Sequence, residues 1–288
     1  MPRDAADLVD LLDLETIDTN LFRGRQAVSS LPRLFGGQAA AQAVVAAGRT
    51  VDPAYVLHSL HSYFLQPGDA SAPIIFDVET IREGRSFATR RVLARQHGRP
   101  IYALTADFQR PEEGWEHQQV APVVPPPEEC PDPKKLLGQP EDDPEWGVME
   151  MRYAGSSLDG GLEPDEVRPG RQRVWLRAKG RLPEDPFAHV AAFVYFSDMT
   201  LMGAALVPHG IRIGSADAMV ASLDHSVWFH RPFRVDEWWL YDQESPFAGG
   251  ARGLVHARVH TPDGTLVASV SQEALLRKPR PRRTEEGA

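Results

Sequence analysis

The sequence has a single cysteine in 288 residues, Cys130, so no disulfide bond can form within the chain. Cys130 lies in a proline-rich stretch without the electropositive surroundings that activate a thiol, and we expect it to be inert. The chain also lacks an apolar run approaching the ~20 residues of a membrane-spanning helix. The segment Met1–Asp7 lacks the basic and apolar regions of a secretory signal. These absences predict a soluble, cytoplasmic protein with no membrane partner.

An excess of positive charge is missing as well. The formal net charge is −9, whereas a protein that holds phosphate backbones needs a concentrated basic surface, so we expect no nucleic-acid partner. The one basic cluster spans Arg277–Arg283 and is followed at once by Thr284–Ala288. We predict that this segment is a flexible, solvated tail.

Several catalytic motifs are absent from the chain. It contains no Gly-x-Ser-x-Gly elbow, no Cys-x-x-Cys pair, no His-Glu-x-x-His helix and no Walker loop. The sequence therefore gives no support for a serine nucleophile, for zinc or for nucleotide hydrolysis. We expect an activity that uses neither a metal nor an organic cofactor.

Length and proline content predict two domains. A chain of 288 residues with 42% hydrophobic residues can supply a core to each of two units of roughly 150 residues. Hydrophobic periodicity breaks down between Pro111 and Gly170. This segment holds Pro122, Pro125, Pro126, Pro127, Pro131, Pro133, Pro140 and Pro144. Because proline is excluded from helix interiors and central strands, we predict an N-terminal domain at 1–110, a linker at 111–170 and a C-terminal domain at 171–288.

The same order of elements is predicted on both sides of the linker. The first half is predicted to hold an amphipathic helix at about 4–12, a short strand, an Ala-rich helix at 37–48 and strands near 56–66, 73–82, 87–96 and 101–109. The second half is predicted to hold a strand near 171–180, a shorter helix after Asp198 and strands near 219–230, 237–244, 253–260 and 266–276.

One strand of the second half carries a polar residue where the matching strand of the first half has an apolar one. When the halves are aligned with Gly84 over Gly249 and Gly98 over Gly264, Ala106 falls on Gln272. Gln272 interrupts the apolar face of a period-2 strand that its counterpart leaves intact. A buried amide without partners costs about 1–3 kcal/mol, so we expect Gln272 to have polar neighbours and the second half to hold the chemistry.

The Ala-rich helix predicts the architecture. Residues Gln38–Ala47 are small or apolar on almost every side, so this helix should be enclosed rather than lie on a surface. An antiparallel sheet can close around such a helix. The fold class predicted is α+β, a tandem (double) hotdog in which two antiparallel sheets each wrap a central helix. A generic pair of α+β domains has the same periodicity.

The chain resembles the type II acyl-CoA thioesterases over about residues 18–277. The motifs that carry the resemblance are LFGGQ (34–38), HSLHSYFLQPGD (58–69), DVET (77–80), GRSF (84–87), DHSVWFHRP (224–232) and ASVSQE (268–273). The resemblance implies hydrolysis of acyl-CoA to free fatty acid and CoA and a place in fatty acid metabolism. Because exposed sheet edges or faces of a hotdog usually find a partner, we also expect a homo-oligomer, either a dimer or a tetramer.

The resemblance also implies the site residues. In that family an Asp, a Thr and a Gln hold the attacking water, and these positions fall on Asp198, Ser222 and Gln272, with Ser in place of Thr. A carboxylate can act as general base, while a hydroxyl and an amide can orient water. The carbonyl oxygen needs a donor, and backbone N–H groups at Gly37–Gln38 and at Met199 are placed for that role if each begins a helix.

Each of these residues has a structural alternative. Asp198 could cap the helix expected after it, and Ser222 could be a polar residue on a half-exposed strand. His58 is a reserve general base, because aligning His61 with His225 places it over Ser222. A non-catalytic acyl-CoA binding or sensing module and a hotdog enoyl-CoA hydratase are the alternative functions. The Asp and His set five apart that a hydratase would carry are not found.

Overall fold

The computed structural model describes residues 1–29, 31, 33–133, 147–158 and 169–279. The helices are α1 (Ala5–Leu12), α2 (Gly36–Gly48), α4 (Pro186–Ser197) and α5 (Gly203–Leu206), with 3-10 turns η1 (Pro127–Glu129) and η2 (Val207–His209). The strands are β1 (Glu15–Asp18), β2 (Leu21–Gly24), β3 (Val56–Phe64), β4 (Ile74–Glu83), β5 (Phe87–Gln96), β6 (Arg99–Gln109), β7 (Met149–Ser156), β8 (Gly170–Ala178), β9 (Met219–Ser222), β10 (Asp224–Phe229), β11 (Trp239–Gly249), β12 (Arg252–His260) and β13 (Leu266–Arg277).

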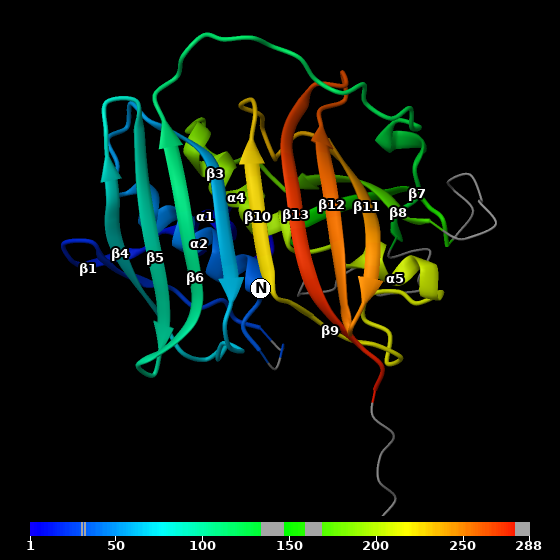
Figure 1. The fold of residues 1–288 in the computed structure, drawn as a ribbon, viewed down its shortest axis with the longest axis horizontal. Helices are drawn as coiled ribbons and strands as arrows, with labels where there is room; N and C mark the ends of the chain where they lie inside the picture. Colours follow the sequence, from blue (N-terminus) through cyan, green and yellow to red (C-terminus); the bar gives the residue numbers. More distant parts are fainter. Residues whose placement is uncertain (30, 32, 134–146, 159–168, 280–288) are drawn as a thin grey trace, which may run out of the picture.

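The strands of the described residues join into one 13-stranded sheet rather than two separate sheets. The order is β1-β2-β4-β5-β6-β3-β10-β13-β12-β11-β8-β7, with β9 paired to β13. The two halves of the chain meet where β3 and β10 pair antiparallel, with His61 opposite Ser226. Figure 1 shows the long strands side by side across the front and the helices α1, α2 and α4 behind them. The prediction of two sheets is therefore corrected, because backbone hydrogen bonds continue across the junction.

Helix α2 is enclosed, as its composition predicts. Every residue from Gly37 to Ala47 is buried. The small side chains let α2 lie close to β5 and β6 on one side and to α4 on the other. Phe187 of α4 packs so closely on Gly48 that a Cβ there would lie 2.2 Å from its ring.

Helix α4 is built differently and lies earlier in the chain than predicted. Asp185 caps its start by accepting the Phe187 N–H at 3.0 Å, and Pro186 occupies its first turn, where a missing N–H costs nothing. The helix ends at Ser197, so Asp198 is its C-cap residue. A shorter helix does follow Asp198, but the prediction missed the long helix α4 before it, and the N-cap alternative for Asp198 is wrong, because the N-cap residue of α5 is Met202. Only the single turn α5 and the turn η2 follow.

The proline-rich segment is partly extended chain and partly strand. The described residues 111–133 hold one 3-10 turn, η1, and cross from β6 to the far edge of the sheet (Figure 1). Residues 149–156 form β7 and pair with β8, so this part of the predicted linker belongs to the sheet. Cys130 is buried beside Trp175 and Leu240, and this burial raises the pKa of its thiol. Pro140 and Pro144, and the tail from residue 280, lie outside the described residues.

The predicted strands are otherwise close to those observed. The hairpins β5–β6 and β12–β13 turn at Gly98 and Gly264, which have φ values of +73° and +85°. Both glycines therefore adopt a left-handed conformation that other residues rarely take. The strand predicted at 219–230 is interrupted at Leu223, whose N–H donates to Glu273 O. Over the described residues, no helix has the length and apolar character needed to cross a membrane.

Candidate active site

Asp198 is the centre of a buried hydrogen-bond cluster at the end of α4. Its Oδ1 accepts from Ser222 Oγ at 2.8 Å and from Gln272 Nε2 at 2.9 Å. Gln272 Nε2 also donates to Ser222 Oγ at 2.8 Å, so the three side chains are bonded to one another in a closed triangle. Residues that lie 24 and 50 positions apart in sequence thus meet at one point. The structure brings together all three residues implied by the resemblance.

The start of α2, from the first half of the chain, completes the surroundings of this carboxylate. The Gly37 N–H hydrogen-bonds Asp198, and this bond opposes the rise in the pKa of Asp198. A Cβ at residue 36 would lie 2.6 Å from Asp198 Oδ2, so Gly36 permits the close approach of the helix. The partial positive charge of a helix N-terminus favours an anion at this position. Both halves of the chain therefore hold the carboxylate.

Burial dominates the electrostatics of the cluster. Asp198 is 4% exposed, and removal from water raises the pKa of its carboxyl group, against the lowering effects of His225, Ser222 and Gln272. Burial likewise lowers the pKa of His225, which is 0% exposed. We therefore describe His225 as a neutral imidazole at pH 7 and Asp198 as a stronger base, when ionised, than an exposed aspartate.

A cavity of about 1400 Å³ opens beside the cluster. Asp198 and Ser222 line it, whereas Gln272 lies behind them, out of the lining. Most of the lining is apolar and comes from both halves of the chain. Apolar lining residues include Leu31, Leu34, Phe35, Phe64, Met149, Val174, Met199, Met202, Val207, Ile211, Ile213, Val220 and Leu275. Basic lining residues are Arg3, Arg33, Arg152, Lys179 and Arg212. The cavity thus combines a mainly apolar lining with these basic groups and with the acidic groups of Asp132 and Glu150.

The backbone donors expected at the carbonyl oxygen have other partners. Gly37 N–H is directed at Asp198, and Gln38 N–H donates to Phe35 O at 3.2 Å. Met199 follows the end of α4 instead of beginning a helix, and its N–H donates to Phe196 O at 3.0 Å. The expectation for Met199 is therefore wrong, because the helix lies on the other side of Asp198.

His58 lies apart from the cluster. Its Nε2 is 3.2 Å from Asp107 Oδ2, and Thr89 Oγ1 donates to Asp107 Oδ1 at 2.7 Å. His58 is not among the described residues that line the cavity. The structure does not bring this reserve candidate to Asp198.

The strand register also corrects the alignment that suggested His58. Ser222 pairs with Ala274 across β9 and β13, and Leu57 pairs with Phe108 across β3 and β6. Phe108 stands two residues after Ala106 just as Ala274 stands two residues after Gln272. Leu57 is therefore the counterpart of Ser222, and the sequence alignment was displaced by one residue on this strand.

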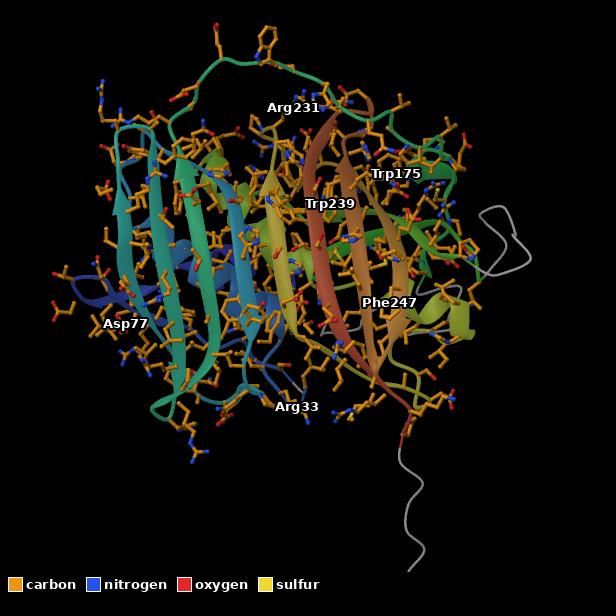
Figure 2. All side chains as sticks on the ribbon, in the orientation of Figure 1. Arg33, Asp77, Trp175, Arg231, Trp239 and Phe247 are labelled. Carbon is orange, nitrogen blue, oxygen red and sulfur yellow. The ribbon has the colours of Figure 1, made fainter. Side chains whose placement is uncertain are left out.

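Three arginines outside the cavity are committed to other contacts. Arg90 is buried and bonds Thr50 and Glu83, Arg91 pairs with Glu79, and Arg231 lies 3.6 Å from Glu116. Figure 2 shows Arg231 at the upper end of the strands and Arg33 at the lower end. Of these labelled arginines, Arg33 is the one that lines the cavity.

Two buried residues of the cluster were not identified from the sequence. His225 Nδ1 lies 2.7 Å from Gln272 Oε1, and His225 Nε2 lies 2.7 Å from Ser197 Oγ. Both residues have 0% exposure. The signal for His225 was available, because it lies on the same period-2 face as Val227 within one of the family motifs.

Comparisons with known proteins agree with this architecture. The family model of acyl-CoA thioesterases matches residues 160–275, and that of the acyl-CoA thioesterase N-terminal domain matches residues 27–109. Human acyl-coenzyme A thioesterase 8 is 41% identical over 284 residues, covering 93% of this chain and 88% of that protein. Acyl-CoA thioesterase 2 of Haemophilus influenzae is 39% identical and covers 94% of this chain and 97% of its own length.

Solved structures give the same result for the fold. An acyl-CoA thioesterase II from Mycobacterium marinum superposes with a TM-score of 0.82 at 44% identity, covering 94% of this chain and 98% of that chain. A protein of hot dog fold from Alicyclobacillus acidocaldarius superposes with a TM-score of 0.76 at 23% identity, covering 94% and 98% of the two chains. The class defined by fold and sequence is that of hotdog-fold thioester hydrolases. Within this class, the chain belongs to the type II acyl-CoA thioesterase family.

The raised pKa of Asp198 predicts the acid side of the pH profile. If ionised Asp198 is the base, kcat/KM should fall about tenfold per pH unit once the pH drops below that pKa. Because burial raises the pKa, the fall begins above the ordinary aspartate value of 3.8. Tyr102 and Tyr241 are neutral there, because burial raises the pKa of each phenol, and they do not reverse the sign. Rates measured across pH on folded enzyme test this, and a profile flat down to pH 3.8 contradicts it.

Proposed function

We propose that the enzyme hydrolyses acyl-CoA thioesters to free fatty acid and CoA, using a water molecule held by Asp198, Ser222 and Gln272. The observation that carries the proposal is the closed hydrogen-bond triangle of these side chains at the wall of a large cavity. Asp198 and Ser222 face the cavity, so a water there can reach the carboxylate and the hydroxyl together. A family relationship to acyl-CoA thioesterases supports the substrate class.

The proposed reaction needs no covalent enzyme intermediate. Ionised Asp198 takes a proton from the water as its oxygen attacks the thioester carbonyl carbon. The tetrahedral intermediate then collapses with cleavage of the C–S bond, and the sulfur of CoA receives the proton that Asp198 had taken. The products are the carboxylic acid and the thiol, and Asp198 is again ionised.

The cavity suits both ends of such a substrate. Its apolar lining can remove an acyl chain from water, which contributes about 25 cal/mol for each Å² buried. Arg33 and Lys179 are basic groups of the lining that can attract the phosphates of CoA.

Release of CoA from a medium-chain acyl-CoA tests the proposal. We expect steady turnover of thiol in a colorimetric assay, with free acid formed in equal amount. Tight binding of the acyl-CoA without release of thiol would identify a binding or sensing module instead. Addition of water to an enoyl-CoA would identify a hydratase.

The hydroxyl of Ser222 is expected to orient and not to attack. Ser222 Oγ donates its proton to Asp198 and accepts a hydrogen bond from Gln272. The remaining lone pair of the hydroxyl oxygen can accept a hydrogen bond from a water molecule and so hold it in place. Ser222→Thr should keep most of the activity, while Ser222→Ala should lose up to about tenfold in kcat, the worth of one hydrogen bond. Mass spectrometry during turnover provides the check, because an acyl group trapped on Ser222 is incompatible with direct attack by water.

We also propose that the chain is a double hotdog, with units at 1–110 and 171–288, in which the intervening segment 111–170 links the two units and also supplies strand β7. Equivalent hairpins at Gly98 and Gly264, and one central helix in each half, support this division. Superposition of about residues 15–110 on 170–277 in a crystal structure tests it. The cytoplasmic location, the role in fatty acid metabolism and the homo-oligomer stay predictions, and light scattering on the purified protein tests the last of these.

A further inference from the structure

His225 lies directly behind the proposed site without touching its cavity. It is fully buried on β10, and it is not among the described residues that line the cavity. Its two ring nitrogens contact two side chains, Gln272 Oε1 and Ser197 Oγ, each at 2.7 Å. A side chain placed in this way can act on the reaction only through its neighbours.

The partners of Gln272 determine which way its amide must face. Its Nε2 lies 2.9 Å from Asp198 Oδ1 and 2.8 Å from Ser222 Oγ, and an ionised carboxylate can only accept. The amide oxygen must therefore face His225. Since that oxygen also only accepts, Nδ1 of His225 must carry a proton. Nε2 of the neutral ring is then an acceptor, so the Ser197 hydroxyl, whose oxygen lies 2.7 Å from Nε2 and 3.0 Å from Val194 O, must turn its single proton toward Nε2.

We infer that His225 is a positioning residue, whose Nδ1–H fixes the amide of Gln272 so that both Nε2 protons point at Asp198 and Ser222. The inference rests on the proposed role of Asp198 and Gln272 in holding water. If the amide turned over, its oxygen would face the carboxylate oxygen of Asp198 with no proton between them. Two buried acceptors in contact repel each other, so the donor on His225 selects the orientation that supports the site.

In the first half of the chain, the positions equivalent to His225 and Gln272 are apolar. Leu60 of β3 pairs with Ala106 of β6. In the second half, the register that pairs Ser226 with Ser271 brings His225 opposite Gln272. The alignment of Ala106 with Gln272 therefore matches Leu60 with His225. Both members are apolar in one half and both are polar in the other, as expected if they work as a pair.

The end of α4 holds the imidazole from the other side. Ser197 contacts His225 and immediately precedes Asp198, and Tyr241 Oη donates to the Ser197 carbonyl oxygen at 3.0 Å. The contacts run from Asp198 through Gln272 and His225 to Ser197, and then return to Asp198 along the chain. The position of the carboxylate and the orientation of the amide are thus set by one helix end.

Two substitutions of His225 separate the effect of its N–H donor from the effect of its side-chain volume. His225→Leu fills the space, as Leu60 does in the other half, but removes the donor. His225→Asn can place an amide N–H close to the position of Nδ1. We expect His225→Leu to lower kcat on the order of tenfold with KM changed less than about twofold, and His225→Asn to recover most of kcat. The loss should not exceed the roughly 10²-fold expected for removing Gln272 itself.

The double variant His225→Leu/Gln272→Ala gives the decisive measurement. It copies the Leu60–Ala106 pair, so it should fold and should melt at a higher temperature than His225→Leu, in which Gln272 lacks its donor. Its kcat should equal that of Gln272→Ala alone, because a positioning residue has no effect once its target is gone. Leu60→Ala is the matched control, expected to lower the melting temperature and leave kcat unchanged.

The possible outcomes are distinct. Two results overturn the inference while leaving the proposed function in place. One is a parent-like kcat in His225→Leu. The other is a loss of kcat on His225→Leu that is as large in the Gln272→Ala background as in the parent enzyme. Parent-like CoA release by Asp198→Asn overturns the proposed function itself. If His225→Leu does not fold, His225→Asn is compared with the parent and with Gln272→Ala instead. A folded His225→Asn protein whose kcat is as low as that of Gln272→Ala contradicts the role of the Nδ1 donor.

Discussion

Asp198→Asn is expected to lower kcat for CoA release by roughly 10²- to 10⁴-fold, the range over which a positioned general base contributes. Asparagine keeps the size of the side chain and an oxygen that can accept from Ser222 and Gln272, but it cannot take a proton from water. The low rate should reflect lost chemistry and not lost folding. Thiol release measured together with thermal melting separates the two.

The pH profile of the same variant adds a second readout. Its residual rate should lack the fall at acid pH that Asp198 causes in the parent enzyme, since the group that titrates has been removed. A folded Asp198→Asn protein that releases CoA at the parent rate would show that the base lies elsewhere.

Gln272→Ala is expected to cost on the order of 10²-fold in kcat, about 2.7 kcal/mol of activation free energy, by analogy with removal of one preorganised donor. Its amide nitrogen is bonded to both Asp198 and Ser222, so its loss frees the two groups that face the cavity. The variant should remain folded, because Ala106 occupies the corresponding position of the first half. Kinetics and thermal melting of the purified variant provide the measurement.

Ala106→Gln is the control for this position. It introduces the same amide into the first half, where Leu60 and not a histidine lies opposite. Without a partner the buried amide should lower stability by about 1–3 kcal/mol, and it should add no activity. A gain in CoA release would contradict the assignment of the chemistry to the second half.

The sequence predicted much of the local structure. Period-2 alternation located most strands to within a few residues, and the small residues of Gln38–Ala47 predicted an enclosed helix. The prediction failed for the second helix, where residues 186–197 carry large apolar and aromatic side chains on almost every side. Phe193, for example, contacts the rings of Phe229, Phe233 and Trp239. A helix buried all round lacks the amphipathic pattern by which helices are identified.

The polar residue on an apolar face was the best local signal for the site. The prediction that Gln272 has polar neighbours is confirmed by its contacts with Asp198, Ser222 and His225. The catalytic roles of Asp198, Ser222 and Gln272 came from family resemblance, and they stay predictions that the variants above test.

By itself, the sequence determined most of the strands, the enclosed helix at Gln38–Ala47 and the place where an amide needs partners, because these depend on neighbours along the chain. Only the tertiary structure decided that β3 and β10 join the halves into one sheet, that the start of α2 faces Asp198, and that His225 bonds Gln272. These contacts join residues separated by 47 or more positions. No local periodicity encodes such pairings, since they follow from packing of the whole chain.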